Sequence, residues 1–281
     1  MSIEFFPEIT VGTHGRGAMS VHAIHPGELV ERVSPIAGVF HSRMRGREFP
    51  PHPHAGFSAI TYVFDDSPGS LRNRDSLGND FITAPGGIVW TQAGRGVLHE
   101  EAPADPEREM HGVQIFVNLS ARHKLDEPRV YHLDPHDVHE WRSAAGDRIR
   151  VLVGAFRDVS SPLVPAEPFD LWDVELRGQL SLPLESGRNM LVYVLDGELR
   201  VHTDANDRRV ATAEHALALH SSGGSATFEA VRPARFLVLS GAALDEPVVF
   251  DVHYMMNEPS QLADAAARFA RGAMGQLAPT A

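Results

Sequence analysis

Two pairs of metal-binding side chains at i, i+2 spacing lie in the first half of the chain. His52 and His54 flank Pro53, and His99 and Glu101 flank a second glutamate. Residues i and i+2 of a β-strand point to the same face, so two such pairs on neighbouring strands place three imidazoles and one carboxylate around a single cation. The proline between the first two histidines fits an edge strand. The spacing alone equally fits surface histidines and a solvated acidic pair, and it leaves both interpretations open.

A set of three nitrogens and one oxygen, without sulfur, suits a divalent transition metal. Fe(II), Mn(II), Co(II), Ni(II), Cu(II) and Zn(II) all accept imidazole and carboxylate ligands. An octahedral ion with four protein ligands keeps two positions open, which an oxygen-bearing substrate, dioxygen or both can take. The predicted site can therefore carry out redox chemistry as well as hold structure.

The composition excludes several other kinds of site. The 281 residues include 16 histidines and no cysteine. A disulfide, an iron–sulfur cluster, a thiolate zinc site and a thiol nucleophile are therefore excluded. The formal net charge of −12 argues against direct binding to nucleic acid, which requires a basic face. It does not argue against a protein partner.

Hydropathy gives no sign of a membrane segment or of a targeting signal. No stretch approaches the ~20 apolar residues that cross a membrane. The N-terminal residues lack a basic segment followed by a long apolar run. We therefore expect no membrane association, a cytoplasmic location and a monomer.

Short apolar runs between turn residues predict an all-β chain. The runs are rich in β-branched and aromatic residues, and turn-forming residues follow them. They span residues 58–64, 87–90, 113–118, 148–153, 190–195, 199–201, 216–219 and 235–239. A turn is expected at Asp196-Gly197. Many short strands of this kind indicate a sandwich or a barrel.

The two halves of the chain have a similar layout, which predicts two domains of one design. A run that begins at Tyr62 and another that begins at Tyr193 each lead through a turn to a later apolar strand. We place the border in the polar stretch 136–147, which gives domains of residues 1–138 and 139–281. The second domain has no His-x-His counterpart, so we expect the metal in the first domain and a metal-free second one.

One helix is expected near the C-terminus, over about residues 259–272. Asn257 and Ser260 are candidate N-caps, and Pro259 suits the first turn. An apolar stripe at helical spacing follows. It consists of Leu262, Ala266, Phe269 and Ala273. We expect this stripe to pack on a sheet.

Several motifs resemble signatures of the pirin family, within the cupin superfamily. The resemblance runs in order over nearly the whole chain, and its most specific part is the Ala-Gly-Arg-Gly run before His99. The matching segments are residues 50–57, 74–79, 85–86, 91–101, 112–119, 124 with 127–128, 193–197, 244–248, 256–257 and 272–275.

The resemblance implies a bicupin, that is, two tandem jelly-roll-like β-barrel domains, with a metal ion in the N-terminal one. It implies His52, His54, His99 and Glu101 as the ligands and Fe(II) as the metal, with Mn, Co, Ni, Cu or Zn as alternatives. Several members of the family look like quercetin 2,3-dioxygenases. Others, in eukaryotes, act as iron-dependent partners of transcription factors.

The chain departs from the family at an acidic position. Pirins usually carry a glutamate where this sequence has Ser58. A serine neither ligates as a carboxylate does nor acts as a base at neutral pH. Glu101 is then the only acidic candidate of the set, and we expect it to be both a ligand and the catalytic base.

Two classes of function follow from these patterns. The first is a metal-dependent dioxygenase that cleaves the ring of a flavonol-like aromatic substrate with O2. The second is a metal- or redox-sensing module that binds a protein partner without turnover. A third hypothesis is a cupin oxygenase or isomerase that acts on an unrelated small molecule.

Three residues in or just before one expected strand are further candidates. His111 is either a contact to the metal pocket or a satisfied core or surface histidine. Gln114 and Phe116 share a face at i, i+2 spacing, and we expect them either to line the barrel interior or, for Phe116, to pack in the core.

Overall fold

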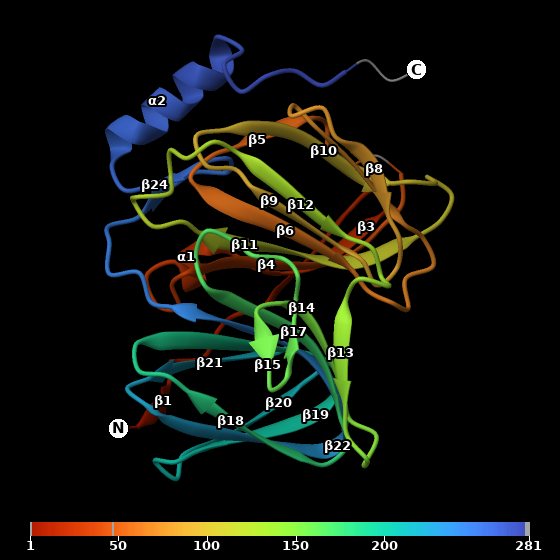
Figure 1. Cartoon of the computed structure of the whole chain (residues 1–281), viewed down its shortest axis with the longest axis vertical. Helices are drawn as coiled ribbons and strands as arrows, with labels where there is room; N and C mark the ends of the chain where they lie inside the picture. The colour runs from red at the N-terminus through yellow and green to blue at the C-terminus, as the bar shows by residue number, and fades with distance from the viewer. Residues whose placement is uncertain (1, 47, 279–281) are drawn as a thin grey trace. The chain divides into compact units, whose positions relative to one another are not determined.

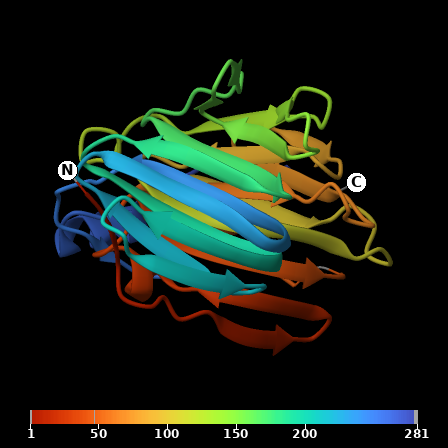
Figure 2. The ribbon, with the colours of Figure 1, turned by 90° about the horizontal axis from the view of Figure 1, so that it is seen from below.

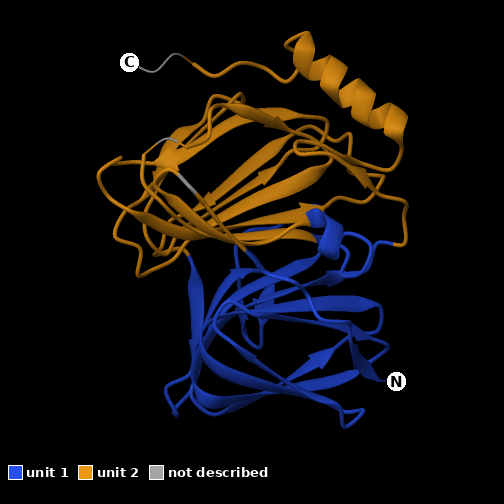
Figure 3. Cartoon of the chain, turned by 180° about the vertical axis from the view of Figure 1, so that it is seen from behind, with its two compact units in different colours: residues 1–12, 26–36, 138–244 blue, residues 13–25, 37–137, 245–281 orange. Residues whose placement is uncertain are grey.

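The computed structural model describes residues 2–46 and 48–278 of the chain. Almost all of the regular structure is antiparallel β-sheet, which confirms the all-β prediction (Figure 1). Within these residues, no helix is long and apolar enough to span a membrane. The strands belong to two compact units (Figure 3). Unit 1 comprises residues 1–12, 26–36 and 138–244, and unit 2 comprises residues 13–25, 37–137 and 245–281.

Unit 2 consists of two antiparallel sheets that pack face to face. The larger sheet has the strand order β12-β9-β6-β11-β4-β3-β2. In that order its strands are Arg129–Leu133, Ile88–Gln92, Phe57–Val63, Met110–Asn118, Ile36–Met44, Met19–Ile24 and Gly12–Arg16. The smaller sheet has the order β5-β10-β7-β8. Its strands are His52–His54, Val97–Pro103, Leu71–Asp75 and Asp80–Thr83.

Strand β6 shows why this part of the sequence forms a central strand. All seven of its residues are buried, and β-branched and aromatic side chains fit a sheet that is covered on both faces. Thr61 reaches Glu101 of the smaller sheet. By the alternation of a strand, Phe57 and Ala59 share this face, whereas Ser58 points to the opposite one.

Unit 1 is built around one large sheet with the strand order β1-β21-β19-β22-β17-β14-β13, in which β18 also pairs with β22 and β20 with β19 (Figure 2). In that order its strands are Ile3–Phe5, Ala216–Ser221, Arg188–Thr203, Gly224–Ala242, Phe169–Leu176, Arg148–Val153 and His139–Arg142, with β18 at Gln179–Leu184 and β20 at Arg208–Thr212. Its core is a large apolar cluster in which Phe228 and Phe236 stack with ring centroids 5.9 Å apart. Aliphatic and aromatic side chains thus fill this interior.

Two expected strands of unit 1 prove to be one. Residues 190–195 and 199–201 both belong to β19. The prediction of a turn at Asp196-Gly197 is therefore wrong. The pairing of β19 with β22 shifts its register around Asp196, which makes this place a β-bulge. Gly197 has a positive φ of 84°, and a Cβ at this position would overlap the carbonyl oxygen of Pro233. Glycine therefore lets the strand bend and continue.

The C-terminal helix exists as predicted, but its cap differs. Helix α2 spans Pro259–Ala270, and its N-cap is Glu258 rather than Asn257 or Ser260. Glu258 and Gln261 form a reciprocal capping box, in which each side chain accepts a hydrogen bond from the backbone of the other. The glutamate satisfies the first turn in the way that serine or threonine usually does.

The buried face of α2 is rotated from the predicted stripe. Ala265 is fully buried and Leu262 is half-buried, whereas Ala266 and Phe269 are exposed. The helix packs on a small cluster that includes Ala55, Tyr254 and Met256. Ala55 directly follows His54, so the helix covers the chain immediately beyond the first histidine pair.

The two units are not consecutive halves of the chain. The N-terminal strand β1 pairs with β21 and so belongs to unit 1. The C-terminal segment 245–281 belongs to unit 2. Residues 26–36 also belong to unit 1, although they lie inside the expected first domain, so the two units alternate along the first 37 residues.

A buried lysine joins the turn after β5 to the C-terminal segment. The Nζ of Lys124 donates to the carbonyl oxygens of Gly56 and Met255, each at 2.9 Å, and to Oδ1 of Asn118 at 2.5 Å. Burial lowers the pKa of Lys124 to about 7, although Glu246 opposes the shift. Gly56 has a φ of 81°, and a Cβ there would overlap the carbonyl oxygen of Met255. The close approach of these two backbones therefore requires glycine.

We expect Gly56→Ala to destabilise the protein by several kcal/mol, since it adds a backbone overlap to the strain of a positive φ. Gly78→Ala is the matched control, because Gly78 has a φ of 95° and open space around its Cα. The control should lose only about 1–2 kcal/mol, which is the cost of the backbone conformation. Urea denaturation measures both values, and equal losses would contradict the close packing of Gly56 on Met255.

Candidate metal centre

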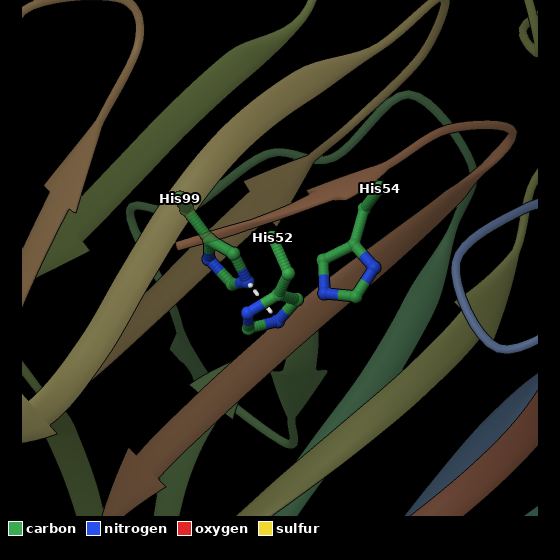
Figure 4. Close-up of side chains that lie close together, drawn as sticks. All are labelled: His52, His54 and His99. Carbon is green, nitrogen blue, oxygen red and sulfur yellow. Dashed lines mark hydrogen bonds between the residues drawn. The ribbon is translucent and has the colours of Figure 1, made fainter. Parts of the chain in front are cut away.

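Three histidines from two neighbouring strands of unit 2 converge on one point. Strand β5 pairs with β10 so that His52 lies directly opposite His99, and His54 shares the face of His52. The ring centroids of His52, His54 and His99 form a nearly equilateral triangle with sides of 4.7, 4.7 and 4.8 Å. One nitrogen from each ring lies within 4.8 Å of the others. Figure 4 shows the rings turned toward one another.

The hydrogen bond of His52 to the backbone leaves one nitrogen lone pair at the centre. The Nδ1 of His52 is 2.9 Å from the carbonyl oxygen of Pro50, which fixes the proton on Nδ1 and leaves the lone pair on Nε2. This Nε2 is 3.1 Å from Nε2 of His99. Among the described residues, the buried Nδ1 of His99 has no hydrogen-bond partner, and the ring nitrogens of His54 form no hydrogen bond of good geometry, although the backbone of His253 is near enough to oppose the lowering of the His54 pKa. A bound ion would account for such nitrogens.

Burial keeps the three imidazoles neutral. It lowers the pKa of His52, lowers that of His54 well below its usual value, and lowers that of His99 to about 3. The neighbouring histidines shift the pKa values of His54 and His99 further in the same direction. Neutral imidazole is the form that binds a metal, so the site is prepared for a cation at neutral pH.

Glu101 lies beside the three histidines but outside the group of mutually close ligand atoms. It is two residues after His99 on β10 and shares its face. Its Oε2 accepts hydrogen bonds from Oγ1 of Thr61 at 2.6 Å and from Nε2 of Gln114 at 3.1 Å. Thr61 and Gln114 are directly opposite each other on β6 and β11, so the strand register creates this pair of donors.

The protonation of Glu101 is shifted by its surroundings. Burial raises the pKa of its carboxyl to about 7, and the hydrogen bonds from Thr61 and Gln114 partly oppose the rise. Both bonds end on Oε2, which leaves Oε1 as the oxygen that can turn to a cation or to a proton donor.

Aromatic side chains form one wall beside His54. The ring of His54 meets Phe57 with centroids 4.9 Å apart and Phe116 with centroids 5.7 Å apart. Phe40 continues the wall, at 5.0 Å from Phe116. Gln114 and Phe116 thus both face the histidine cluster, as one of the two sequence-based interpretations has it. A flat aromatic ligand can stack on such a wall, which also excludes water.

Other sequence candidates lie elsewhere. His111 is on the face of β11 opposite to Gln114, where its Nε2 is 2.8 Å from Nε2 of His41. The hypothesis that His111 contacts the metal pocket is therefore wrong. Ser58 is on the face of β6 opposite to Thr61, so the serine does not stand beside Glu101.

Sequence reasoning missed three polar residues close to the cluster. Asn73 and Asp75 of β7 lie directly opposite Glu101 and His99, and both are buried. His253, far away in the sequence, has its ring centroid 6.0 Å from that of His52 and 6.4 Å from that of His54. The i, i+2 spacing of Asn73 and Asp75 could have identified them. No local sequence pattern identifies His253.

Comparison with known proteins agrees with this architecture. The family model for pirin matches residues 16–117, and the model for the pirin C-terminal cupin domain matches residues 171–275. A Pseudomonas aeruginosa protein, provisionally named quercetin 2,3-dioxygenase, is 34% identical over 225 residues, which are 77% of this chain and 76% of that protein. Human pirin is 29% identical over 221 residues, or 77% of this chain and 74% of the human protein.

Solved structures show the same fold over most of the chain. The crystal structure of quercetin 2,3-dioxygenase from Acinetobacter baumannii matches with a TM-score of 0.86 and 25% identity, over 98% of this chain and 99% of that one. A bacterial pirin from Escherichia coli, in complex with nickel(II), matches with a TM-score of 0.66 and 17% identity, over 86% and 100% of the two chains. With both of its cupin domains matched in order, the chain belongs to the pirin family.

Proposed function

We propose that the protein is a metal-dependent dioxygenase that cleaves the ring of a flavonol-like substrate with O2. The observation that carries the proposal is the cluster of three neutral histidines, two buried and one half-buried, beside Glu101 and an aromatic wall. The name of the Pseudomonas aeruginosa relative supports this substrate class. A cytoplasmic location, a monomeric state and a protein partner stay predictions from the sequence.

The proposed ligands are His52, His54, His99 and Glu101. These residues fit a divalent ion because the set offers three neutral imidazoles, a carboxylate and buried nitrogens that lack other partners among the described residues. We propose Fe(II) as the metal, with Mn, Co, Ni, Cu or Zn as alternatives, and nickel is the ion in the complex of the Escherichia coli pirin. When bound, the ion would supply Lewis acidity toward substrate oxygens and redox chemistry with O2.

The proposed catalytic base is Glu101. Thr61 and Gln114 hold its Oε2, so Oε1 accepts the proton of the flavonol 3-hydroxyl. Burial raises the pKa of this carboxyl to about 7 in the metal-free protein, and a bound cation would lower it again, so the role as base rests on the placement of Oε1 within reach of a substrate hydroxyl. The two donors also keep the carboxylate from turning away.

The aromatic wall orients the substrate and keeps water out. The half-buried ring of Phe116, backed by the buried ring of Phe57, lies next to His54, and a flavonol is flat and aromatic. Overall, the two atoms of O2 enter the organic products while the carbon that bears the 3-hydroxyl leaves, with one oxygen, as carbon monoxide.

Removal of one histidine should abolish tight metal binding. We expect His52→Ala, His54→Ala and His99→Ala each to lower metal affinity by more than ~100-fold, since loss of a ligand should exceed the 10–100-fold cost of losing an outer partner. Elemental analysis of untagged protein after dialysis against a mild chelator measures the stoichiometry. His215→Ala is the control, because His215 is exposed and belongs to neither group of side chains that could hold a metal ion. Metal retained in all three variants would refute the site.

Activity with quercetin is a direct test of the reaction. Anaerobic, metal-loaded protein mixed with quercetin should bleach the flavonol absorption band and release carbon monoxide when air is admitted. Glu101→Gln keeps the shape of the side chain but removes the base, and we expect at least a ~100-fold loss of rate. Absence of bleaching and of carbon monoxide with Fe, Mn, Co, Ni and Cu would contradict the proposed reaction.

Glu101 should also make the stability of the metal-free protein depend on pH. Its pKa rises from the usual 4.5 to about 7 on folding, so the folded protein holds the proton more tightly than the unfolded chain. The stabilising contribution is complete below pH 4.5 and is lost as the pH rises through about 7. It amounts to about 3 kcal/mol.

The buried histidines act in the opposite direction, because their lowered pKa values reduce stability as the pH falls below 6.5. The difference between wild type and Glu101→Gln isolates the carboxyl group. Urea denaturation in chelator, at pH values from about 4 to about 8, measures it, and a difference that does not vary with pH would contradict the raised pKa.

A further inference from the structure

A short hairpin near the C-terminus brings a fourth histidine to the metal centre. Its strands are β23 (Val249–Phe250) and β24 (Met255–Met256), and His253 lies in the loop between them. The ring centroid of His253 is 6.0 Å from that of His52, and the two ring planes differ by 33°. Its ring centroid is 6.4 Å from that of His54.

Hydrogen bonds to its backbone hold this loop in place. Oδ1 of Asp251 accepts hydrogen bonds from the backbone nitrogens of His253 and Tyr254, both at 2.8 Å. The backbone nitrogen of Ala55 donates to the carbonyl oxygen of His253 at 3.2 Å, and that of Met255 donates to the carbonyl oxygen of Ala55 at 3.0 Å. The hairpin therefore hydrogen-bonds directly to the residue that follows His54.

Lys124 strengthens the same junction, because its Nζ donates to the carbonyl oxygens of both Gly56 and Met255. The bond from Lys124 to Met255 and the bonds to the carboxylate of Asp251 fix the loop on both sides of His253. A side chain on such a support is preorganised.

The distances place His253 outside the metal ligands. The three proposed histidine ligands have mutual centroid distances of 4.7–4.8 Å, and both measured distances to His253 are longer. His253 is also not part of the group whose ligand atoms lie within 4.8 Å of one another. Its Nδ1 is nevertheless buried and, in residues 2–46 and 48–278, has no hydrogen-bond partner.

We propose that His253 is a substrate-binding residue whose imidazole hydrogen-bonds an oxygen of the aromatic substrate beside the three-histidine centre. This proposal rests on the proposed function. A neutral imidazole offers one donor and one acceptor, and a flavonol carries hydroxyl and carbonyl oxygens around its rings. A buried nitrogen without a partner among the described residues favours ligands with an oxygen at that position, because a ligand without one leaves the nitrogen unpaired.

Anaerobic titration with quercetin tests the proposal without turnover. Protein loaded with Fe(II) is titrated, and the shift of the flavonol absorption band gives the dissociation constant. His253→Phe keeps an aromatic ring but removes both nitrogens, and His253→Ala removes the ring. We expect both to weaken quercetin binding by about tenfold, in line with the loss of one hydrogen bond in a buried site, with one metal ion still bound.

His253→Asn serves as the rescue variant, since its amide can replace one ring nitrogen. We expect it to bind quercetin within about threefold of wild type, which a purely structural role of the ring would not produce. In aerobic turnover, the loss in His253→Phe should appear mainly in KM. Thermal melting of each variant confirms that the fold is kept.

The remaining outcomes separate this proposal from the proposed function. Unchanged quercetin binding in His253→Phe and His253→Ala, with a wild type that binds, overturns the role of His253 alone. Loss of metal in these variants overturns it too, because His253 would then be a ligand. A metal-loaded wild type that does not bind quercetin overturns the proposed function, and the role of His253 with it.

Discussion

The register of one short antiparallel pair controls the site. Strand β5 has only three residues, His52–His54, and its pairing with β10 sets His52 opposite His99. Since side chains alternate across a strand, a shift of one residue would turn both histidines of β5 to the other face. Pro53 and the glycine-rich turn before Val97 are both compatible with this register. Pro53 can lack a donor because β5 is an edge strand, and the glycine-rich turn before Val97 lets β10 begin at the required residue.

The same short strand depends on residues that are far away in the sequence. Ala55 bonds to the backbone of His253 and Met255, and Gly56 allows the C-terminal hairpin to approach closely. The ammonium group of Lys124 then satisfies carbonyl oxygens on both sides of this joint. A buried lysine costs free energy unless it is fully hydrogen-bonded, and here three acceptors surround it. The C-terminal segment thus supports the metal-binding edge, and helix α2 covers it.

The sequence predicted the parts of the site that local spacing defines. His52, His54 and His99 were recognisable from i, i+2 pairs, and their convergence needed only antiparallel pairing. Gln114 and Thr61 are neighbours because of the register between β6 and β11. No local sequence pattern predicts this register. The proximity of His253 to His52 could not be predicted for the same reason, because the two residues are far apart in the sequence. In α2, a one-residue difference in the apolar stripe moved burial from Ala266 to Ala265, since contact with Ala55 and Tyr254, and not the amphipathic pattern, decides which face is covered.

The charge balance of the site explains why Glu101 suits the role of base. Three neutral imidazoles and one carboxylate around a divalent ion leave one net positive charge in a buried place, where unbalanced charge is costly. Transfer of a proton from a substrate hydroxyl to Glu101 does not change this total, because the substrate oxygen gains the negative charge that the carboxylate loses. Burial raises the pKa of Glu101 in the metal-free protein, and a bound cation would lower the pKa of this carboxyl and that of a substrate hydroxyl alike. Thr61 and Gln114 limit that rise by their bonds to Oε2, which keeps the group able to ionise near neutral pH.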